Sequence, residues 1–273
     1  MSGIKKGALG AGRHLLLILL CLFAVFPLFW MVSSSFKNMG EILGAGLLPL
    51  HPTVENYVYA FREMPIARMM VNSFIIAIAM SVCQIVVAVL TAYALTRWNF
   101  PGKTLLYMLL TLTWLIPFQA IMIPNYIEIN NMGLKGTLLA VILPYVAAAF
   151  CCISMYQSFQ SFPFALIDAA RMDGAGELRI LWDILLPNMR STIASLGILQ
   201  FITGWNEYMW PMLVSEGLES APIQIGLRSF VGSDTNLWGS LMAAATVSCL
   251  PILILYCVMQ KNIVNSFMKW GIK

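Results

Sequence analysis

Long runs of apolar residues recur along the chain, and the clearest lies between Met69 and Thr96, where no residue carries a formal charge. A helix of this length in a soluble protein normally shows a polar face, which this run lacks. At about 1.5 Å per residue, the run is long enough to cross about 30 Å of hydrocarbon. The pattern therefore predicts helices that lie in lipid.

Six stretches satisfy this length, and together they predict an all-α integral membrane protein made of a single transmembrane domain over residues 1–273. The predicted spans are about 15–35, 70–95, 104–124, 137–158, 189–212 and 238–259. The first follows basic residues as a secretory signal would, but its apolar run to Met31 is longer than the apolar part of such a signal. We interpret it as an uncleaved helix.

Composition agrees with this class, because 60% of the residues are hydrophobic and only 10% are charged. Lysine and arginine favour cytoplasmic loops, so their distribution predicts orientation. With both ends inside, 11 of the 16 basic residues fall on the inner side and 5 on the outer side. The inner set is Lys5, Lys6, Arg13, Arg97, Lys103, Arg171, Arg179, Arg190, Lys261, Lys269 and Lys273, and the outer set is Lys37, Arg62, Arg68, Lys135 and Arg228. We therefore expect cytoplasmic termini.

The sequence lacks the residue patterns that mark several other classes of protein. The net charge of +4 is spread over the loops without a dense basic run, which disfavours nucleic-acid binding. The six cysteines lie in the spans without a C-x-x-C pair, and His14 and His51 lie outside them, so no metal or zinc-enzyme pattern is present. Neither a catalytic cluster nor the phosphate-binding G-x-x-x-x-G-K-[ST] motif occurs, so we expect neither enzymatic activity nor ATP binding by this chain.

Charged residues are almost absent from the spans, with Glu207 as the main exception. Ion-coupled carriers usually keep a few charges there for coupling. An ion-coupled secondary carrier is thus the weaker alternative, and the sequence favours a transporter whose energy comes from another chain.

The only sizeable cytoplasmic loop, about 160–187, predicts two short helices. Pro163 suits the first turn of the first helix, and Gly174 suits a left-handed cap at its end. In the second, one face of an α-helix would hold Leu178, Leu181, Trp182 and Leu185. Such helices favour docking of a partner protein, while an ordinary solvated loop remains the alternative.

The same loop resembles the "EAA" loop of binding-protein-dependent ABC importer permeases, whose spacing is E-A-A-x-x-x-G-x9-I-x-L-P. It matches Asp168-Ala169-Ala170, Gly174 and Ile184-x-Leu186-Pro187, and differs in having Asp168 where the family has glutamate. The segment Gly204-Trp205-Asn206-Glu207-Tyr208-Met209-Trp210-Pro211 resembles the G-W-N-x-[FY]-x-W-P signature of the carbohydrate-uptake branch. Weaker similarities are Asn72-Ser73, Tyr93-Ala94-Leu95 and Glu55-Asn56-Tyr57, so the resemblance covers nearly the whole chain.

The resemblance implies the smaller permease of a maltose-type transporter in a prokaryotic inner membrane. It implies a second permease, two cytoplasmic ATPase subunits that bind ATP and Mg, an external solute-binding protein, and import of a sugar or sugar-like solute by alternating access. Asp168 would pair with a basic residue of the ATPase, Ala169 and Ala170 would seat the loop helix, and Gly174 would make its turn. The implied ATPase-coupling residues are Asp168, Ala169, Ala170, Asp173, Gly174, Ile184 and Pro187.

Polar residues within or at the ends of spans predict a solute path or gate, because they normally face a cavity or a neighbouring helix. These are Asn72, Ser73, Gln119, Asn206 and Glu207. Hydrogen bonding between helices is the alternative for each of them, and solute contacts can also lie in the second permease. A related permease for a non-sugar solute such as a glycerol phosphate remains a further alternative.

Overall fold

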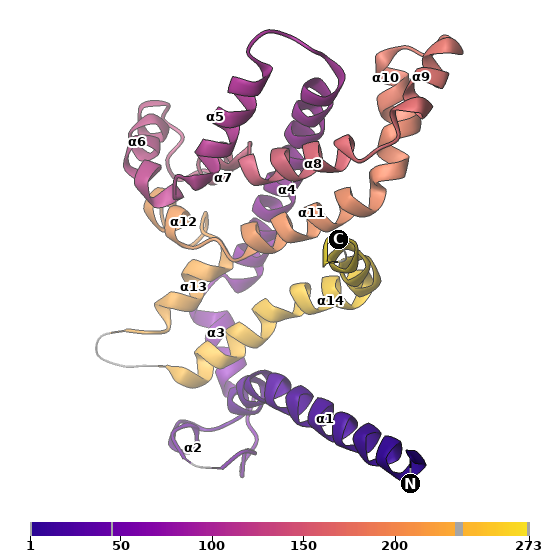
Figure 1. Cartoon of the computed structure of the whole chain (residues 1–273). Coiled ribbons are helices and arrows are strands. Elements are labelled where there is room, and N and C mark those ends of the chain that lie inside the picture. The colour runs from indigo at the N-terminus through magenta and orange to yellow at the C-terminus, as the bar shows by residue number, and fades with distance from the viewer. Residues whose placement is uncertain (1, 45, 233–236, 272–273) are drawn as a thin grey trace. The chain divides into compact units, whose positions relative to one another are not determined.

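The computed structural model describes residues 2–44, 46–232 and 237–271, with side chains for 12–44, 46–232 and 237–260. In this described part the chain is all-helical, as predicted (Figure 1). The elements are α1 (Ser2–Ser35), α2 (Met39–Ile42), α3 (Glu55–Glu63), α4 (Ile66–Arg97), α5 (Lys103–Leu115), α6 (Phe118–Asn131), α7 (Leu138–Ile142), the 3-10 turn η1 (Leu143–Tyr145), α8 (Ala149–Gln160), α9 (Phe164–Met172), α10 (Glu177–Arg179), the π-helix η2 (Ile180–Leu185), α11 (Leu186–Trp205), α12 (Met209–Val214), α13 (Ile223–Ser229) and α14 (Trp238–Gly271). Part of the orientation prediction lies outside the described residues, namely Lys273 and the side chains of Lys5, Lys6, Lys261 and Lys269.

Three helices in this described part are long and apolar enough to cross a membrane, and two bent helix pairs raise this number to five if each pair is one span. The single helices are Gly12–Ser35, Ile66–Arg97 and Trp238–Gln260. The bent pairs are α5 with α6, at 96°, and α7–η1 with α8, at 45°. The predicted span 189–212 is not among these five, so the count of six stays a prediction.

The predicted span 104–124 is not one unbroken helix, because α5 ends at Leu115 and α6 begins at Phe118. Pro117 lacks the N–H that would continue the helix, and a residue before proline is driven towards extended backbone. Ile116 accordingly has φ −80° and ψ 116°. The proline thus sets the sharp bend.

The chain divides into two compact units, described separately: residues 1–66 with 227–250, and residues 67–226 with 251–273. In the first unit, the end of α1 is tied to α3 by Asn56, which donates to the carbonyl oxygens of Ser35 at 2.9 Å and Lys37 at 2.8 Å. Lys37 is buried, donates to the Gly46 oxygen at 2.6 Å and lies 4.3 Å from the centre of the Trp30 ring. The Glu55-Asn56-Tyr57 segment is therefore a structural tie.

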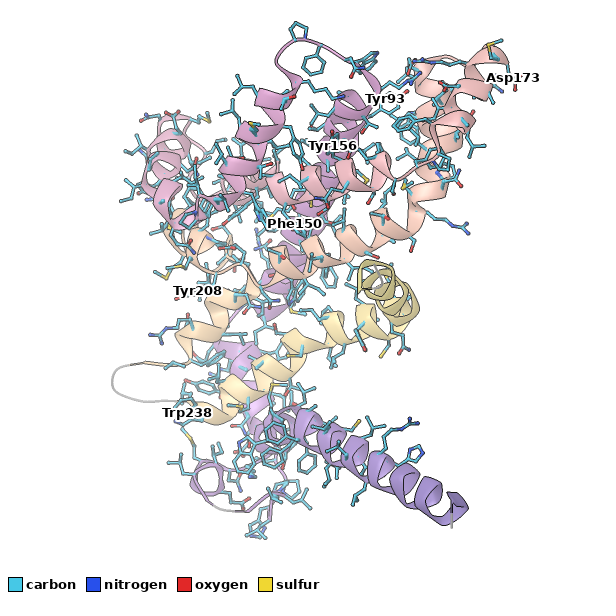
Figure 2. The ribbon with its side chains drawn as sticks, viewed as in Figure 1. Tyr93, Phe150, Tyr156, Asp173, Tyr208 and Trp238 are labelled. Atoms are coloured by element: carbon cyan, nitrogen blue, oxygen red, sulfur yellow. The ribbon has the colours of Figure 1, made fainter. Side chains whose placement is uncertain are left out.

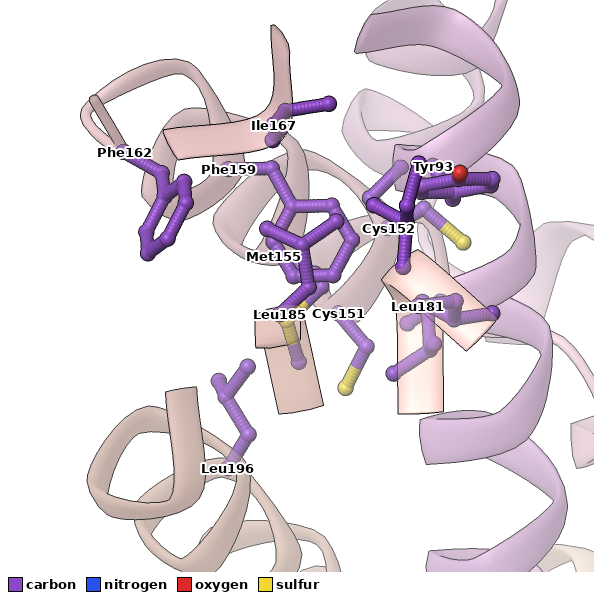
Figure 3. Close-up of a cluster of buried hydrophobic side chains, with 14 residues drawn as sticks. Tyr93, Cys151, Cys152, Met155, Phe159, Phe162, Ile167, Leu181, Leu185 and Leu196 are labelled. Carbon is purple, nitrogen blue, oxygen red and sulfur yellow. The ribbon is translucent and has the colours of Figure 1, made fainter. Parts of the chain in front are cut away.

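In the second unit, one buried cluster joins the middle of the chain to the loop at about 160–187 (Figure 3). Its side chains come from α4, α8, the turn after α8, α9, η2 and α11, and those labelled in the figure are Tyr93, Cys151, Cys152, Met155, Phe159, Phe162, Ile167, Leu181, Leu185 and Leu196. Because Ile167 of α9 is part of this core, the loop helix is packed against the spans.

Candidate functional site

The first loop helix has the predicted ends. Pro163 is the residue before α9, and Gly174 has a φ of +80°, the left-handed conformation that glycine adopts at least cost. The N–H of Gly174 donates to the Arg171 oxygen at 2.9 Å, and the N–H of Ala175 donates to the Ala170 oxygen at 3.0 Å. This pair of bonds is the Schellman arrangement that closes a helix end.

The residues predicted to couple to an ATPase lie on the outer surface of this helix. Asp168, Ala169 and Asp173 are exposed, whereas Ala170 is half-buried against the core cluster and Ile167, just before Asp168, is buried in it. In Figure 2, Asp173 lies at the tip formed by α9 and α10. The loop thus presents a carboxylate and a small residue outward while its other face is fixed.

The predicted apolar face of the second loop helix is partly wrong. Leu181 and Leu185 are buried, but Leu178 is 73% exposed and Trp182 is 65% exposed. The reason is that η2 is a π-helix, whose i→i+5 bonds make a wider turn than the 3.6-residue turn assumed. Residues four apart therefore share a direction, which aligns Leu181 with Leu185 and turns Trp182 outward.

The last two coupling positions lie where the loop joins α11. Ile184 is half-buried against the core cluster, and Pro187 is exposed at the start of α11. Helical backbone runs from Glu177 through η2 to Trp205, so the loop and the predicted fifth span are continuous.

Glu177 contacts side chains of α4 and α9, and the sequence analysis did not predict these contacts. Its Oε2 accepts from the Tyr93 hydroxyl at 2.5 Å and from Arg97 Nε at 3.2 Å, while its other oxygen pairs with Arg171. The Tyr93 hydroxyl also lies 3.1 Å from the Glu177 carbonyl oxygen. Tyr93 and Arg97 stand 84 and 80 residues from Glu177, so no local pattern marks the contact.

A second region forms where three helices break. The Phe118 ring lies just after the first break. It stacks on the Tyr145 ring, with 4.5 Å between ring centres, and meets the Trp210 ring edge-on, with 5.7 Å between ring centres. Trp210 is fully buried, and its Nε1 donates to the Ala140 oxygen at 3.0 Å. The breaks after α5, η1 and α11 therefore lie together around these aromatic rings.

Glu207 occupies the third break. Its Oε1 accepts from the Trp210 backbone N–H at 3.3 Å, and its carboxylate lies near the Tyr145 hydroxyl. Gln84 of α4 donates to the Tyr145 carbonyl at 2.7 Å, while its own Oε1 is buried without a partner in the described structure. The Glu207 carboxylate and the Gln84 Oε1 are therefore two hydrogen-bond acceptors near Tyr145. A site for a polar solute needs such acceptors.

The other path candidates differ in their surroundings. Gln119 is exposed in the first turn of α6. Asn206 is exposed and donates to the Ile202 oxygen at 2.9 Å, which closes the end of α11. Within the described structure, neither side chain is hydrogen-bonded to Tyr145 or Glu207, so both stay predictions for the path.

Asn72 and Ser73 are occupied inside the chain. Asn72 donates to the carbonyl oxygens of Glu219 at 2.9 Å and Ala221 at 3.1 Å, and Ser73 Oγ accepts from the Ile223 N–H at 2.8 Å. Both side chains are buried. This favours the alternative that they hold the chain together, here by fixing the segment 219–223 to the start of α4.

Two solvent-accessible ion pairs lie at or just before this segment, Arg68 with Glu219 at 2.9 Å and Lys135 with Glu216 at 3.3 Å. The hydrogen bond to the Glu216 carboxylate raises the pKa of Lys135. Exposed pairs contribute about 0–1 kcal/mol each. The bonds from Asn72 and Ser73 therefore fix this segment more than the ion pairs do.

The Gly204–Pro211 motif is explained by the third break. A Cβ on Gly204 would lie 3.1 Å from Ala77 Cα, so glycine permits close approach of α11 to α4. Trp205 is buried and meets Phe74 edge-on at 4.9 Å between ring centres.

Among the described side chains, no group of three or more His, Cys, Asp or Glu is placed to hold a metal ion.

Comparison with known proteins gives consistent matches. The family model of the binding-protein-dependent transport system inner membrane component matches residues 84–269. The diacetylchitobiose uptake system permease protein NgcG of Streptomyces coelicolor is 32% identical, over 93% of this chain and 85% of that protein. The sn-glycerol-3-phosphate transport system permease protein UgpE of Yersinia pestis is 31% identical, over 91% of this chain and 92% of that protein.

A solved structure has the same fold. A chain in the crystal structure of a bacterial ABC transporter involved in the import of the acidic polysaccharide alginate superposes with a TM-score of 0.83 at 24% identity. The match covers 94% of this chain and 97% of that chain.

Proposed function

The chain belongs to the family of binding-protein-dependent transport system inner membrane components, and from this premise we propose that it is a permease subunit of an ATP-driven importer for a sugar or sugar-like solute. The observation that carries the proposal is α9, whose inner face is buried in the core while Asp168 and Ala169 face outward. The related permease for diacetylchitobiose uptake supports a sugar. The related permease for glycerol 3-phosphate supports a second candidate, a phosphate-bearing solute.

In this proposal the outer face of α9 docks on a cytoplasmic ATPase. Asp168 pairs with a basic residue of the ATPase, Ala169 and Ala170 allow close approach, and Asp173 lies at the rim. ATP and Mg are bound by two ATPase subunits, a second permease completes the channel, and a solute-binding protein delivers the solute from outside. The chain crosses the inner membrane six times with both termini in the cytoplasm.

Coupling follows from how α9 is fixed. Because Ile167 packs with side chains of α4, α8 and α11, closure of the ATPase dimer moves the loop and these helices together. Rigid packing of this kind favours a switch between discrete inward-open and outward-open states.

The proposal is tested by affinity purification of the tagged chain from mild detergent, comparing wild type with Asp168→Lys. Reversing the charge places two cations at the contact, so we expect about tenfold less ATPase to co-purify. Glu219→Lys, the same reversal at an exposed residue on the predicted outer side, should leave the ATPase bound. A wild-type chain that purifies alone and still transports would instead indicate a carrier.

A second experiment concerns Glu207 and the solute. A carboxylate accepts stronger hydrogen bonds from sugar hydroxyls than an amide does, and it repels a phosphate. We therefore expect Glu207→Gln to lower uptake of labelled diacetylchitobiose about tenfold while the ATPase still co-purifies. Tyr145→Phe, which removes only the hydroxyl near the carboxylate, should have a smaller effect. Increased uptake of glycerol 3-phosphate by Glu207→Gln would favour the second candidate.

A further inference from the structure

Glu177 lies between the loop helix and a span, and it contacts both. We propose that Glu177 is a positioning residue that joins the coupling loop to α4 and sets how much of the movement of α9 reaches that helix. The inference rests on the proposed function, which makes α9 the docking helix.

The geometry places one carboxylate between two cations of different elements. Arg97 comes from the last turn of α4, and Arg171 comes from the last turn of α9. The Tyr93 hydroxyl, one turn before Arg97, donates to the same Oε2 that accepts from Arg97. Glu177 thus holds the ends of the two helices at a fixed separation.

Burial of Arg97 makes its contact with Glu177 costly to break. The Arg97 side chain is only 9% exposed, and its Nη2 has no hydrogen-bond partner in the described structure. Separating a buried cation from its carboxylate leaves a charge without compensation, which is strongly unfavourable. Sliding of α9 relative to α4 is therefore resisted by charge as well as by packing.

The helix that receives the movement is suited to transmit it. α4 runs 32 residues without a break, about 48 Å at 1.5 Å per residue. At its other end Asn72 and Ser73 hold the segment 219–223. The joint at Glu177 therefore connects the coupling loop with an outer segment through one unbroken helix, whereas the pairs α5–α6 and α7–α8 are bent.

The test uses the complete complex in proteoliposomes, with its solute-binding protein outside, ATP inside and labelled diacetylchitobiose as the probe. We expect Glu177→Gln to lower the solute taken up per ATP hydrolysed about tenfold, a typical size for coupling between sites, with the ATPase rate within about twofold of wild type. Asp183→Asn is the matched control, because it neutralises an exposed pair with Arg179 on the same loop. It should leave the ratio unchanged.

A double-mutant cycle with Arg97→Gln separates positioning from general damage. If Glu177 and Arg97 act through each other, the double variant takes up as much solute per ATP hydrolysed as each single variant. If the losses of the two single variants multiply in the double variant, the proposal is overturned. Should Glu177→Gln not assemble, Tyr93→Phe removes one neutral donor and is expected to lower the ratio about fivefold. A wild-type complex that couples ATP to uptake, together with an equally coupled Glu177→Gln, overturns this inference alone. A wild type without ATP-dependent uptake overturns the proposed function.

Discussion

Replacing Trp210 by alanine is expected to lower the free energy of unfolding by about 3–5 kcal/mol, the usual cost of deleting a large buried aromatic side chain. Trp210 is fully buried, touches the Phe118 ring and donates to the Ala140 oxygen, so the change leaves a cavity and an unpaired acceptor where the helix breaks meet. Thermal unfolding of the purified chain in detergent, followed by tryptophan fluorescence or light scattering, measures the loss.

Two further variants make this result specific. Trp210→Phe keeps most of the ring but loses the donor, and should cost about 1–3 kcal/mol. Trp182→Ala removes the same atoms from a side chain that is 65% exposed, and should change stability by less than about 0.5 kcal/mol. If Trp210→Ala unfolds at the same temperature as Trp182→Ala, the aromatic contact does not hold the breaks together.

Local signals predicted the local structure well. Pro163 and Gly174 mark the two ends of α9, because proline and glycine act on the backbone of their own positions. The uncharged run ending at Thr96 likewise predicted α4 as one long helix. In these cases the residues that decide the structure are close together in the chain.

Features that depend on distant residues were not predictable in the same way. The outward turn of Trp182 follows from a π-helical turn that is compatible with the same apolar residues as an α-helix. The contact of Glu177 with Tyr93 joins elements 84 residues apart. The sequence identified Glu207 as an unusual charge in a span, but its contact with Tyr145 depends on how the broken helices pack.

The family assignment and the geometry narrow the alternatives together. Membership in a binding-protein-dependent transport family favours energy from a separate ATPase over ion coupling. The burial of Ile167 argues against an ordinary solvated loop, because such a loop would not contribute a side chain to the core. Glu207 remains the position where a neutral sugar and a phosphate-bearing solute make opposite electrostatic demands.

Gly174→Val is expected to lower ATP-driven uptake by about thirtyfold to a hundredfold. Gly174 has a φ of +80°, and a left-handed backbone costs a β-branched residue about 1–3 kcal/mol. No atom lies within 4 Å of the position a Cβ would take, so the effect comes from backbone strain rather than from a clash. The strain opens the Schellman bonds at the end of α9 and misplaces Asp168 and Ala169. Uptake of labelled diacetylchitobiose at equal protein level measures the loss.

Two glycine variants separate backbone conformation from side-chain bulk. Asparagine tolerates the left-handed region, so Gly174→Asn should keep most of the uptake although its side chain is as large as that of valine. Gly176 has a φ of −70° and open space around its Cβ position, so Gly176→Ala should be neutral. If Gly174→Val and Gly174→Asn fail equally, bulk at an ATPase contact is responsible. If Gly174→Val transports normally at normal expression, the turn has no part in coupling.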